Sequence, residues 1–402
     1  MEVKRVETGK AKKIMPRSTT IFILVLIALA SILGYNYFAQ PFAGLNSIPT
    51  EELEQMIVDQ EIEGDLDKIE QPISETELSQ LIALPYLLSA DESTQSAVVS
   101  WIIQNQPGAV TLFGEKISSS AASLAINKIG DNFDKETKPL IAVDHEGGRV
   151  QRLSGVGFTD LPSWESVCAL NEAQRKNLLS TSAQELSQVG VEMIFAPVID
   201  VASQSAVLKD RICSSDPTTI TQRAAEFIEI FGQQKIWPVI KHYPGIGSIS
   251  KDLHRQYDEV DLSEEEILVF KDLLSTYQFL GVMSAHVGVK DRYEDLPCSL
   301  NSDCIGDLND YFPQALVFTD ALDMSSAESY PGVEKPLSLA ERSVLAILAG
   351  NDVLVFGPNV KLVDIKEVSL ALATTYKSDK EFQRQAKISI KKIRQYKAFL
   401  RQ

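Results

Sequence analysis

The sequence has little of several residue types, and each scarcity excludes a class of protein. Only four cysteines occur among 402 residues, so the chain is not a small scaffold held together by many disulfides. Asp and Glu (55) outnumber Lys and Arg (38), and the net charge of −17 argues against nucleic acid as a partner, because binding phosphates requires a basic surface. Apolar (44%) and charged (23%) residues occur in ordinary globular proportions, which excludes disordered, collagen-like and polytopic membrane chains.

Motifs for metals and nucleotides are also missing. The sequence contains no H-E-x-x-H, no C-x-x-C and no pair of histidines four residues apart, although a metal site assembled from separate strands stays an alternative. No glycine-rich phosphate loop opens a helix after the first predicted strand, which argues against a nucleotide-binding sheet. We therefore expect neither a metal nor another cofactor.

The N-terminal end combines a basic segment with a long apolar run. Residues 1–18 carry six basic and two acidic residues, a net charge of +4, which leaves −21 for the rest of the chain. Residues 19–38 contain no charged side chain, and 20 residues of helix span about 30 Å, enough to cross a bilayer. We predict a basic cytoplasmic end, a transmembrane signal-anchor over 19–38 and a body outside the cell membrane. A cleaved signal peptide with secretion, and a buried core helix, are the alternatives.

The rest of the chain divides into a linker and one domain. Between residues 51 and 77 there are eleven acidic residues against one lysine, so we interpret residues 39–77 as an acidic linker, with an interaction segment as the alternative. We see no internal repeat and no second domain after it. Residues 78–402 are therefore expected to form a single catalytic domain, which we take to be monomeric.

Beyond the linker, short apolar runs alternate with amphipathic segments, which is typical of βαβ units and a parallel sheet. Eight such runs favour an α/β fold of the closed (β/α)₈ or TIM-barrel type, with a doubly wound open sheet as the alternative. The predicted strands are 81–88, 109–113, 140–143, 193–199, 238–242, 281–287, 315–319 and 353–356. The clearest predicted helices are 93–104, 171–188, 218–234, 263–277 and the C-terminal stretch 380–402.

Polar residues follow five of these predicted strands, where a barrel gathers its active-site residues at one face. They are Asp144, Asp200, Lys241 with His242, His286, and Asp320. The sequence has only four histidines, and all of them follow strands or lie shortly beyond one, so we expect all four on this face. They are His145, His242, His254 and His286.

Two of these features have a specific chemical interpretation. Asp252 and His254 lie two residues apart in a loop rich in small residues, and a carboxylate beside an imidazole raises the pKa of the ring and suits it to proton transfer. A solvated polar loop is the alternative. Asp320 follows an apolar run and is either a helix N-cap or a site carboxylate, and opposite a histidine acid and a lysine it becomes a candidate nucleophile.

Four ordered stretches resemble motifs of family 3 glycoside hydrolases. The resemblance is closest to the bacterial β-N-acetylhexosaminidases of that family, which remove N-acetylglucosamine from cell-wall fragments. Order and spacing fit from about residue 80 to 400. The stretches are 140–153 (LIAVDHEGGRVQRL), 210–217 (DRICSSDP), 241–254 (KHYPGIGSISKDLH) and 318–324 (FTDALDM).

The resemblance implies an activity and roles for individual residues. It implies a retaining glycosidase that forms a covalent glycosyl-aspartate at Asp320, with His254 as general acid/base and Asp252 as the dyad partner of His254. A terminal β-linked N-acetylglucosamine of an oligosaccharide or muropeptide is the implied substrate. A β-glucosidase, a β-N-acetylglucosaminide phosphorylase and a non-catalytic glycan-binding barrel are the alternatives. The residues implied to hold the sugar hydroxyls are Asp144, Arg152, Arg211, Lys241 and His242.

The sequence departs from the family pattern at several positions. Ile246 replaces the second histidine of P-G-H-G, Leu253 replaces the usual serine of D-x-H, and His145 replaces the common glutamine after the motif aspartate. The usual R-S-F-G is R-I-C-S at residues 211–214. Ile246 and Leu253 make the loop that carries His254 more apolar, so we expect its closure or its aglycone preference to differ.

The cellular compartment decides whether the four cysteines can form disulfides. A body outside the membrane permits disulfides. Cys298 and Cys304 are six residues apart and can form a local bridge, and Cys168 and Cys213 both follow motifs of the sugar site and can form the other. Four free thiols are the alternative.

Overall fold

The computed structural model describes residues 72–401 except 204, 278, 294 and 295. The predicted cytoplasmic end, the signal-anchor and residues 39–71 of the linker lie outside this range. In the part of the chain that the structure describes, none of the helices has the length and hydrophobicity of a membrane span.

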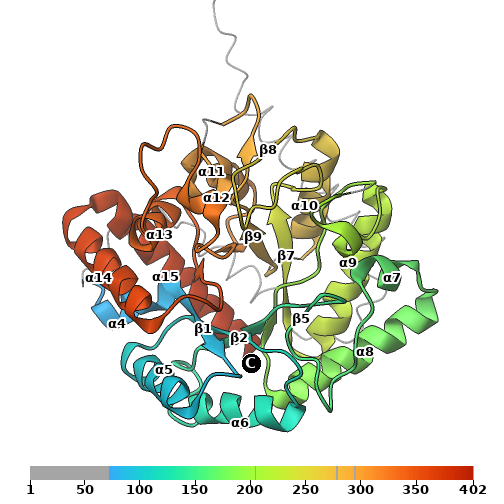
Figure 1. Cartoon of the computed structure of the whole chain (residues 1–402), viewed down its shortest axis with the longest axis horizontal. Coiled ribbons are helices and arrows are strands. Elements are labelled where there is room, and N and C mark those ends of the chain that lie inside the picture. Colours follow the sequence, from blue (N-terminus) through green and yellow to red (C-terminus); the bar gives the residue numbers. More distant parts are fainter. Residues whose placement is uncertain (1–71, 204, 278, 294–295, 402) are drawn as a thin grey trace, which may run out of the picture. The chain divides into compact units, whose positions relative to one another are not determined.

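Eight parallel strands form one barrel-like sheet (Figure 1), in the order β11-β9-β7-β6-β3-β2-β1-β12. The two outermost strands, β11 and β12, are joined by a bridge between Phe318 and Val353, so the sheet nearly closes on itself. The predicted α/β class and parallel eight-stranded sheet are confirmed. The strands are β1 (Ile82–Leu87), β2 (Ala109–Phe113), β3 (Leu140–Val143), β6 (Met193–Ile194), β7 (Trp237–Tyr243), β9 (Gly281–Ser284), β11 (Leu316–Thr319) and β12 (Leu354–Val355).

One predicted strand is shorter than its apolar run. The run 193–199 is regular only over Met193–Ile194, because Pro197 has no amide hydrogen to donate to the neighbouring strand. Val198 rejoins the sheet through a single bridge to Lys241 in β7. The run therefore still delivers Asp200 to the carboxyl end of the sheet.

Helices surround the strands in Figure 1 and cover the outer face of the sheet. The five clearest predicted helices are confirmed as α5 (Glu92–Asn105), α8 (Glu172–Val189), α9 (Pro217–Gln233), α10 (Glu264–Thr276) and α15 (Lys380–Leu400). The others are α4 (Glu75–Leu78), α6 (Ser119–Gly130), α7 (Trp164–Ala169), α11 (Ser302–Tyr311), α12 (Ser325–Glu328), α13 (Leu339–Ala349) and α14 (Leu362–Ser378).

Short polar side chains start these helices, as N-caps do. Asp91, Asn171 and Asp216 each accept a hydrogen bond from a backbone amide of the first turn of α5, α8 and α9. Ser263 and Glu266 form a reciprocal capping box at the start of α10. Local sequence thus sets where these four helices begin, and their apolar faces then pack on the sheet.

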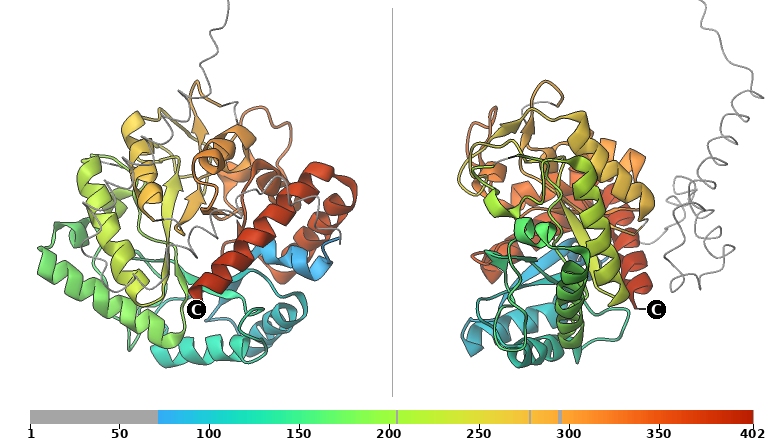
Figure 2. Two further views of the ribbon diagram at one scale, coloured as in Figure 1. Left: turned by 180° about the vertical axis from the view of Figure 1, so that it is seen from behind. Right: turned by 90° about the vertical axis from the view of Figure 1, so that its right-hand side faces the viewer.

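Helix α15 closes the amino-terminal end of the strands, and the left view of Figure 2, which is seen from behind, shows it in the foreground. The Tyr396 hydroxyl accepts a hydrogen bond from the amide of Leu316 and donates to the carbonyl of Leu280. Lys392 Nζ lies 2.8 Å from the buried carboxylate of Asp352, just before β12. The first described residues pack against α14, since the amide of Ile73 donates to the hydroxyl of Tyr376 in that helix. The opposite, carboxyl end of the strands remains for the functional residues.

Short elements shape that carboxyl end. They are β4 (His145–Gly147) paired with β5 (Val150–Gln151), β8 (Glu259–Val260) paired with β10 (Gly288–Val289), and the 3₁₀ turns η3 (Lys209–Arg211) and η4 (Cys298–Leu300), while a third turn, η2 (Ser79–Leu81), precedes β1.

Candidate active site

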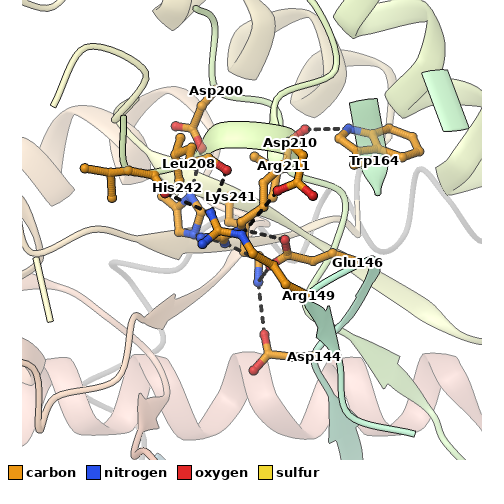
Figure 3. A network of polar contacts seen from close by, with 12 residues as sticks. Asp144, Glu146, Arg149, Trp164, Asp200, Leu208, Asp210, Arg211, Lys241 and His242 are labelled. Atoms are coloured by element: carbon orange, nitrogen blue, oxygen red, sulfur yellow. Dashed lines mark hydrogen bonds and ion pairs between the residues drawn. The ribbon is translucent and has the colours of Figure 1, made fainter. Parts of the chain in front are cut away.

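A network of charged side chains lies at the carboxyl ends of the strands (Figure 3). Lys241 and His242 belong to β7, Arg211 ends the turn η3, and Asp144 directly follows β3. Five residues predicted to hold the sugar are brought together here, four of them through direct contacts. The fifth, Arg152, lies at the edge of the network.

Glu146 is the centre of this network. Its carboxylate accepts two parallel hydrogen bonds from Arg211 at 2.7 and 2.9 Å, and Lys241 Nζ lies 2.6 Å from Oε1, one of the two oxygens that Arg211 contacts. Lys241 Nζ also donates to Asp144 Oδ1 at 3.0 Å. The glutamate side chain is only 1% exposed, so water does not compete for these bonds.

The pKa values follow from these contacts. Burial raises the pKa of Glu146, but the charges of Arg211 and Lys241 outweigh burial and lower it to about 2. Burial lowers the pKa of Lys241, while Asp144 and Glu146 raise it above its usual value. Both partners therefore stay charged at neutral pH and present fixed donors and acceptors.

His242 connects this network to a second buried carboxylate. Its Nδ1 lies 2.8 Å from Asp200 Oδ2, and its Nε2 lies 3.1 Å from Arg211 Nη2. A guanidinium only donates hydrogen bonds, so Nε2 accepts, and the proton of the ring is at Nδ1, where it is donated to Asp200. The other oxygen of Asp200 accepts the amide of Ile246 at 2.7 Å.

Arg152 is held less tightly than the other cations. Its Nε lies 3.8 Å from Asp144 Oδ2, and its guanidinium lies 5.8 Å from the centre of the Phe113 ring. Among the described residues, no hydrogen-bond partner reaches this Nε. Arg152 thus keeps donor capacity at the edge of the network.

Asp320 directly follows β11 and is partly buried. Its own amide donates to the carbonyl of Ser284 at 2.8 Å, and the amide of Ala321 donates to its Oδ1 at 2.7 Å. Burial raises the pKa of this carboxyl, but the imidazoles of three histidines near it lower the pKa below its ordinary value. These histidines are His242, His286 and His254.

The loop of Asp252 and His254 lies on the same rim. Asp252 Oδ1 accepts a hydrogen bond from the backbone N–H of His254 at 3.0 Å. The side chain of His254 is exposed, and its backbone carbonyl accepts a hydrogen bond from the amide of Ser325, five residues beyond Asp320, at 3.4 Å, so the two residues lie on adjoining segments of the rim.

Two other histidines, His145 and His286, do not face the open rim, contrary to the prediction from the sequence. The expectation for His145 is wrong, because its Nε2 lies 3.2 Å from the Ser182 hydroxyl in α8, on the helix side of the sheet. Side chains alternate along an extended segment, so Asp144 and Glu146 point to the site and His145 points away. Burial lowers the pKa of His145 to about 3, which keeps the ring neutral.

His286 is buried beneath the nucleophile candidate rather than open to a ligand. Its Nε2 lies 3.0 Å from the carbonyl oxygen of Ala321, and its Nδ1 lies 2.5 Å from the Ser299 hydroxyl. A carbonyl only accepts, so Nε2 carries the proton and Nδ1 accepts from the serine. His286 therefore supports the backbone next to Asp320.

Two buried carboxylates of the site, Glu146 and Asp200, had no predicted role. Glu146 lies two residues after Asp144, and the same alternation that turns His145 away places both acids on one face. Asp200 was noted at the end of its strand without a role. The available signal was an acidic residue at or shortly after the end of an apolar run, in a chain that carries a lysine and an arginine after other runs. A carboxylate buried there needs such charged partners.

All four cysteines are paired, as Cys168–Cys213 and Cys298–Cys304. The first disulfide joins α7 to the segment just after Arg211. The second lies around Ser299, the partner of His286. Both disulfides therefore tie down segments that contact the network.

A parallel barrel-like sheet with carboxylates, cations and imidazoles at its carboxyl ends defines an enzyme of the barrel class that binds a polar ligand. Comparison with known proteins gives the family: residues 65–391 match the family described as "Glycosyl hydrolase family 3 N terminal domain". The chain belongs to glycosyl hydrolase family 3 and is a glycosidase, which confirms the resemblance predicted from its motifs.

Individual relatives agree with this assignment. The chain is 35% identical over 228 residues to a β-hexosaminidase of Idiomarina loihiensis, covering 54% of this chain and 67% of the relative. It is 31% identical over 290 residues to a β-hexosaminidase of Photobacterium profundum, covering 69% and 81%.

Solved structures share the fold. The β-N-acetylhexosaminidase of Beutenbergia cavernae has a TM-score of 0.70 at 23% identity, covering 81% of this chain and 99% of that one. LpqI of M. tuberculosis has a TM-score of 0.69 at 22% identity, covering 83% and 95%.

Proposed function

We propose that the protein is a retaining β-N-acetylglucosaminidase that removes terminal β-linked N-acetylglucosamine from cell-wall fragments or related oligosaccharides. The observation that carries the proposal is the arrangement of an ionised Asp320 and an exposed His254 on adjoining segments at the carboxyl end of the barrel-like sheet. Retaining hydrolysis requires a nucleophile and a proton donor on either side of the glycosidic bond. The curated relatives, which are β-hexosaminidases, support N-acetylhexosamine as the sugar.

Asp320 is the nucleophile in this mechanism. The amide of Ala321 holds one carboxylate oxygen and fixes the orientation of the group. An Asp320 oxygen bonds to the anomeric carbon as the bond from that carbon to the leaving oxygen breaks, which gives a glycosyl ester. The lowered pKa of Asp320 keeps the attacking group ionised.

His254 moves the protons. Its imidazolium donates a proton to the departing glycosidic oxygen, and the resulting neutral ring then removes a proton from the water that hydrolyses the ester. Asp252 fixes the backbone of His254 through its amide hydrogen bond. In the closed complex we assign Asp252 as the carboxylate partner of the ring.

The charged network holds the sugar. Asp144 accepts from a sugar hydroxyl, while Lys241, Arg211 and Arg152 donate to hydroxyl oxygens, and such charge-assisted bonds are short and directional. Arg152, which is only loosely paired with Asp144, adds a guanidinium at the edge of the site. His242 completes this set.

We also propose a place for the enzyme. The predicted signal-anchor over residues 19–38 holds a monomeric catalytic domain outside the cell membrane, at the end of the acidic linker, where it meets muropeptides. Two disulfides in the structure support an oxidising compartment. Detection of the full-length chain in the membrane fraction, rather than of a shortened form in the medium, tests the anchor against cleavage.

One experiment tests the activity. The protein is incubated with the 4-nitrophenyl β-glycosides of GlcNAc, GalNAc and Glc and with a muropeptide, each with and without phosphate. We expect turnover of the GlcNAc substrates, with β-GlcNAc as the first product by NMR. A sugar 1-phosphate as the main product indicates a phosphorylase, and binding without any turnover indicates a glycan-binding barrel. Either result contradicts the proposal.

A further inference from the structure

The loop that carries His254 is anchored at both ends. At its start, the amide of Ile246 donates to Asp200 at 2.7 Å. At its end, Asp258 Oδ2 accepts the amides of Ser250 and Lys251 at 2.7 and 2.9 Å. The strand β8 follows directly and pairs with β10. Residues 246–258, which we name the acid–base loop, therefore form a closed unit.

An apolar cluster lies beneath this loop. It joins the acid–base loop to the segment around Arg211, to the segment after β9 and to the segment after Asp320. We name it the rim cluster. Its buried members are Leu208, Ile212, Ile246, Ile249, Leu253, Val260, Ala285, Val287, Val289 and Met324.

Leu253 is the member of the rim cluster that lies directly between Asp252 and His254 in the chain. It is 2% exposed, whereas the Asp252 side chain is 44% exposed and His254 is exposed. Its side chain thus points into the cluster while both polar neighbours point to the open rim.

The backbone at this point is also tied to the nucleophile side of the site. The amide of Ser326 donates to the carbonyl of Leu253 at 3.2 Å, and the amide of Ser325 donates to the carbonyl of His254 at 3.4 Å. Both serines lie in α12, which begins five residues after Asp320. The acid–base loop is therefore attached to the segment that carries the nucleophile.

We propose that Leu253 is a positioning residue that holds the acid–base loop against the rim cluster in the free enzyme and so sets the place of His254 relative to Asp320. This inference rests on the proposed roles of His254 and Asp320. Leu253 acts through its neighbour and does not itself contact the substrate. If Leu253 served only the general stability of the fold, its substitution would not act selectively on trypsin cleavage of the loop or on substrates with poor leaving groups.

The first test measures loop docking without using activity. Lys251 and Arg255 flank Leu253 and are trypsin sites, and cleavage by trypsin requires the loop to leave its place. We expect Leu253→Ser to be cut at these two bonds roughly tenfold faster than the wild type. Leu253→Met and the control Leu179→Ser, which changes a leucine of α8 that is 1% exposed, should keep the wild-type rate at these bonds. Equal rates in Leu253→Ser and the wild type would overturn the proposal.

The second test uses the leaving group. Loss of a well-placed general acid affects a poor leaving group more than a good one, because a good one departs without protonation. We expect Leu253→Ser to lower kcat/KM, which reports cleavage of the glycosidic bond and not the later release of the sugar, about tenfold or more for 4-methoxyphenyl β-GlcNAc, but less than about threefold for the 2,4-dinitrophenyl glycoside. Leu179→Ser should change both substrates by the same factor. An equal fall for both substrates in Leu253→Ser would overturn the positioning role.

Two further points keep the tests decisive. If Leu253→Ser does not fold, Leu253→Ala makes the smaller change, and the same two comparisons apply to it. If the wild type hydrolyses neither glycoside, the proposed function has failed, and the trypsin comparison still decides whether Leu253 docks the loop.

Discussion

Arg211 and Glu146 are joined by two parallel hydrogen bonds, from Nε to Oε2 at 2.7 Å and from Nη2 to Oε1 at 2.9 Å. The same carboxylate contacts Lys241 Nζ at 2.6 Å. One buried anion thus fixes two cations that lie on different elements. The position of both cations, and with them the shape of the proposed sugar site, depends on this carboxylate.

Glu146→Gln tests that dependence. The amide leaves two buried cations without their shared anion, and removing one partner of a buried pair costs about 3–5 kcal/mol in the free energy of unfolding. We expect kcat/KM to fall about a hundredfold or more, since Arg211 and Lys241 no longer hold their geometry. Chemical denaturation and steady-state kinetics measure the two effects. The control Glu172→Gln removes an exposed pair with Lys176 and should leave Tm and kcat/KM unchanged; a Glu146→Gln variant that behaves like this control would contradict the account.

The Cys168–Cys213 disulfide should stabilise the fold and the segment of Arg211 together. The two cysteines are separated by 45 residues, and a crosslink over such a loop stabilises a protein by about 2–4 kcal/mol. Cys168→Ser/Cys213→Ser should lose stability of this size and raise KM more than it lowers kcat. Denaturant titration and kinetics measure both. The separation in Cys298–Cys304 is 6, so removing that bridge should cost less stability; the reverse order would contradict this prediction.

Lys397 should make stability depend on pH. Its Nζ donates to Gln80 at 2.7 Å at the amino-terminal end of the sheet, and burial lowers its pKa from 10.5 to about 7. Arg401 and Arg394 lower this pKa as well, whereas Glu192 raises it. Between these pKa values the unfolded chain binds the proton and the folded chain does not, so stability rises with pH from about 7 to 10.5.

Lys397→Met tests this dependence. Each pH unit in that window contributes up to about 1.4 kcal/mol per group, so the wild type should gain about 2–3 kcal/mol relative to the variant between about pH 7 and 9. Urea unfolding at several pH values measures the difference. Lys380→Met changes an exposed lysine of the same helix and should follow the wild-type curve. Parallel curves for Lys397→Met and the wild type would show that Lys397 remains charged in the folded state.

The order of strands and helices was predictable because the apolar runs are bounded by polar or small residues and the longer predicted helices begin at short polar N-caps. The exception is the run 193–199, where the regular strand ends before Pro197. Proline cannot donate a backbone hydrogen bond, and whether this interrupts a strand depends on the pairing with the neighbouring strand. The position of the site was predictable for a similar reason, since the carboxyl ends of parallel strands meet at one face.

Partner choices within the site were less predictable. The role of Glu146 follows from contacts with Arg211 and Lys241, which lie 65 and 95 residues further along the chain. His145 looked equivalent to the other histidines until the alternation of the extended segment placed it against α8. The apolar residues Ile246 and Leu253 looked like changes in loop polarity, whereas their burial in the rim cluster depends on three other segments.

Direct detection of the glycosyl-enzyme tests the central claim, that Asp320 is the nucleophile of a retaining hydrolase. His254→Ala is mixed with 2,4-dinitrophenyl β-GlcNAc, whose good leaving group departs without an acid while the missing base slows release of the sugar. Intact-protein mass spectrometry followed by peptide mapping then locates the adduct. The account predicts one N-acetylglucosamine residue attached to Asp320 and no adduct in the His254→Ala/Asp320→Asn double variant. An adduct on another residue, or turnover in Asp320→Asn at the wild-type rate, would contradict it.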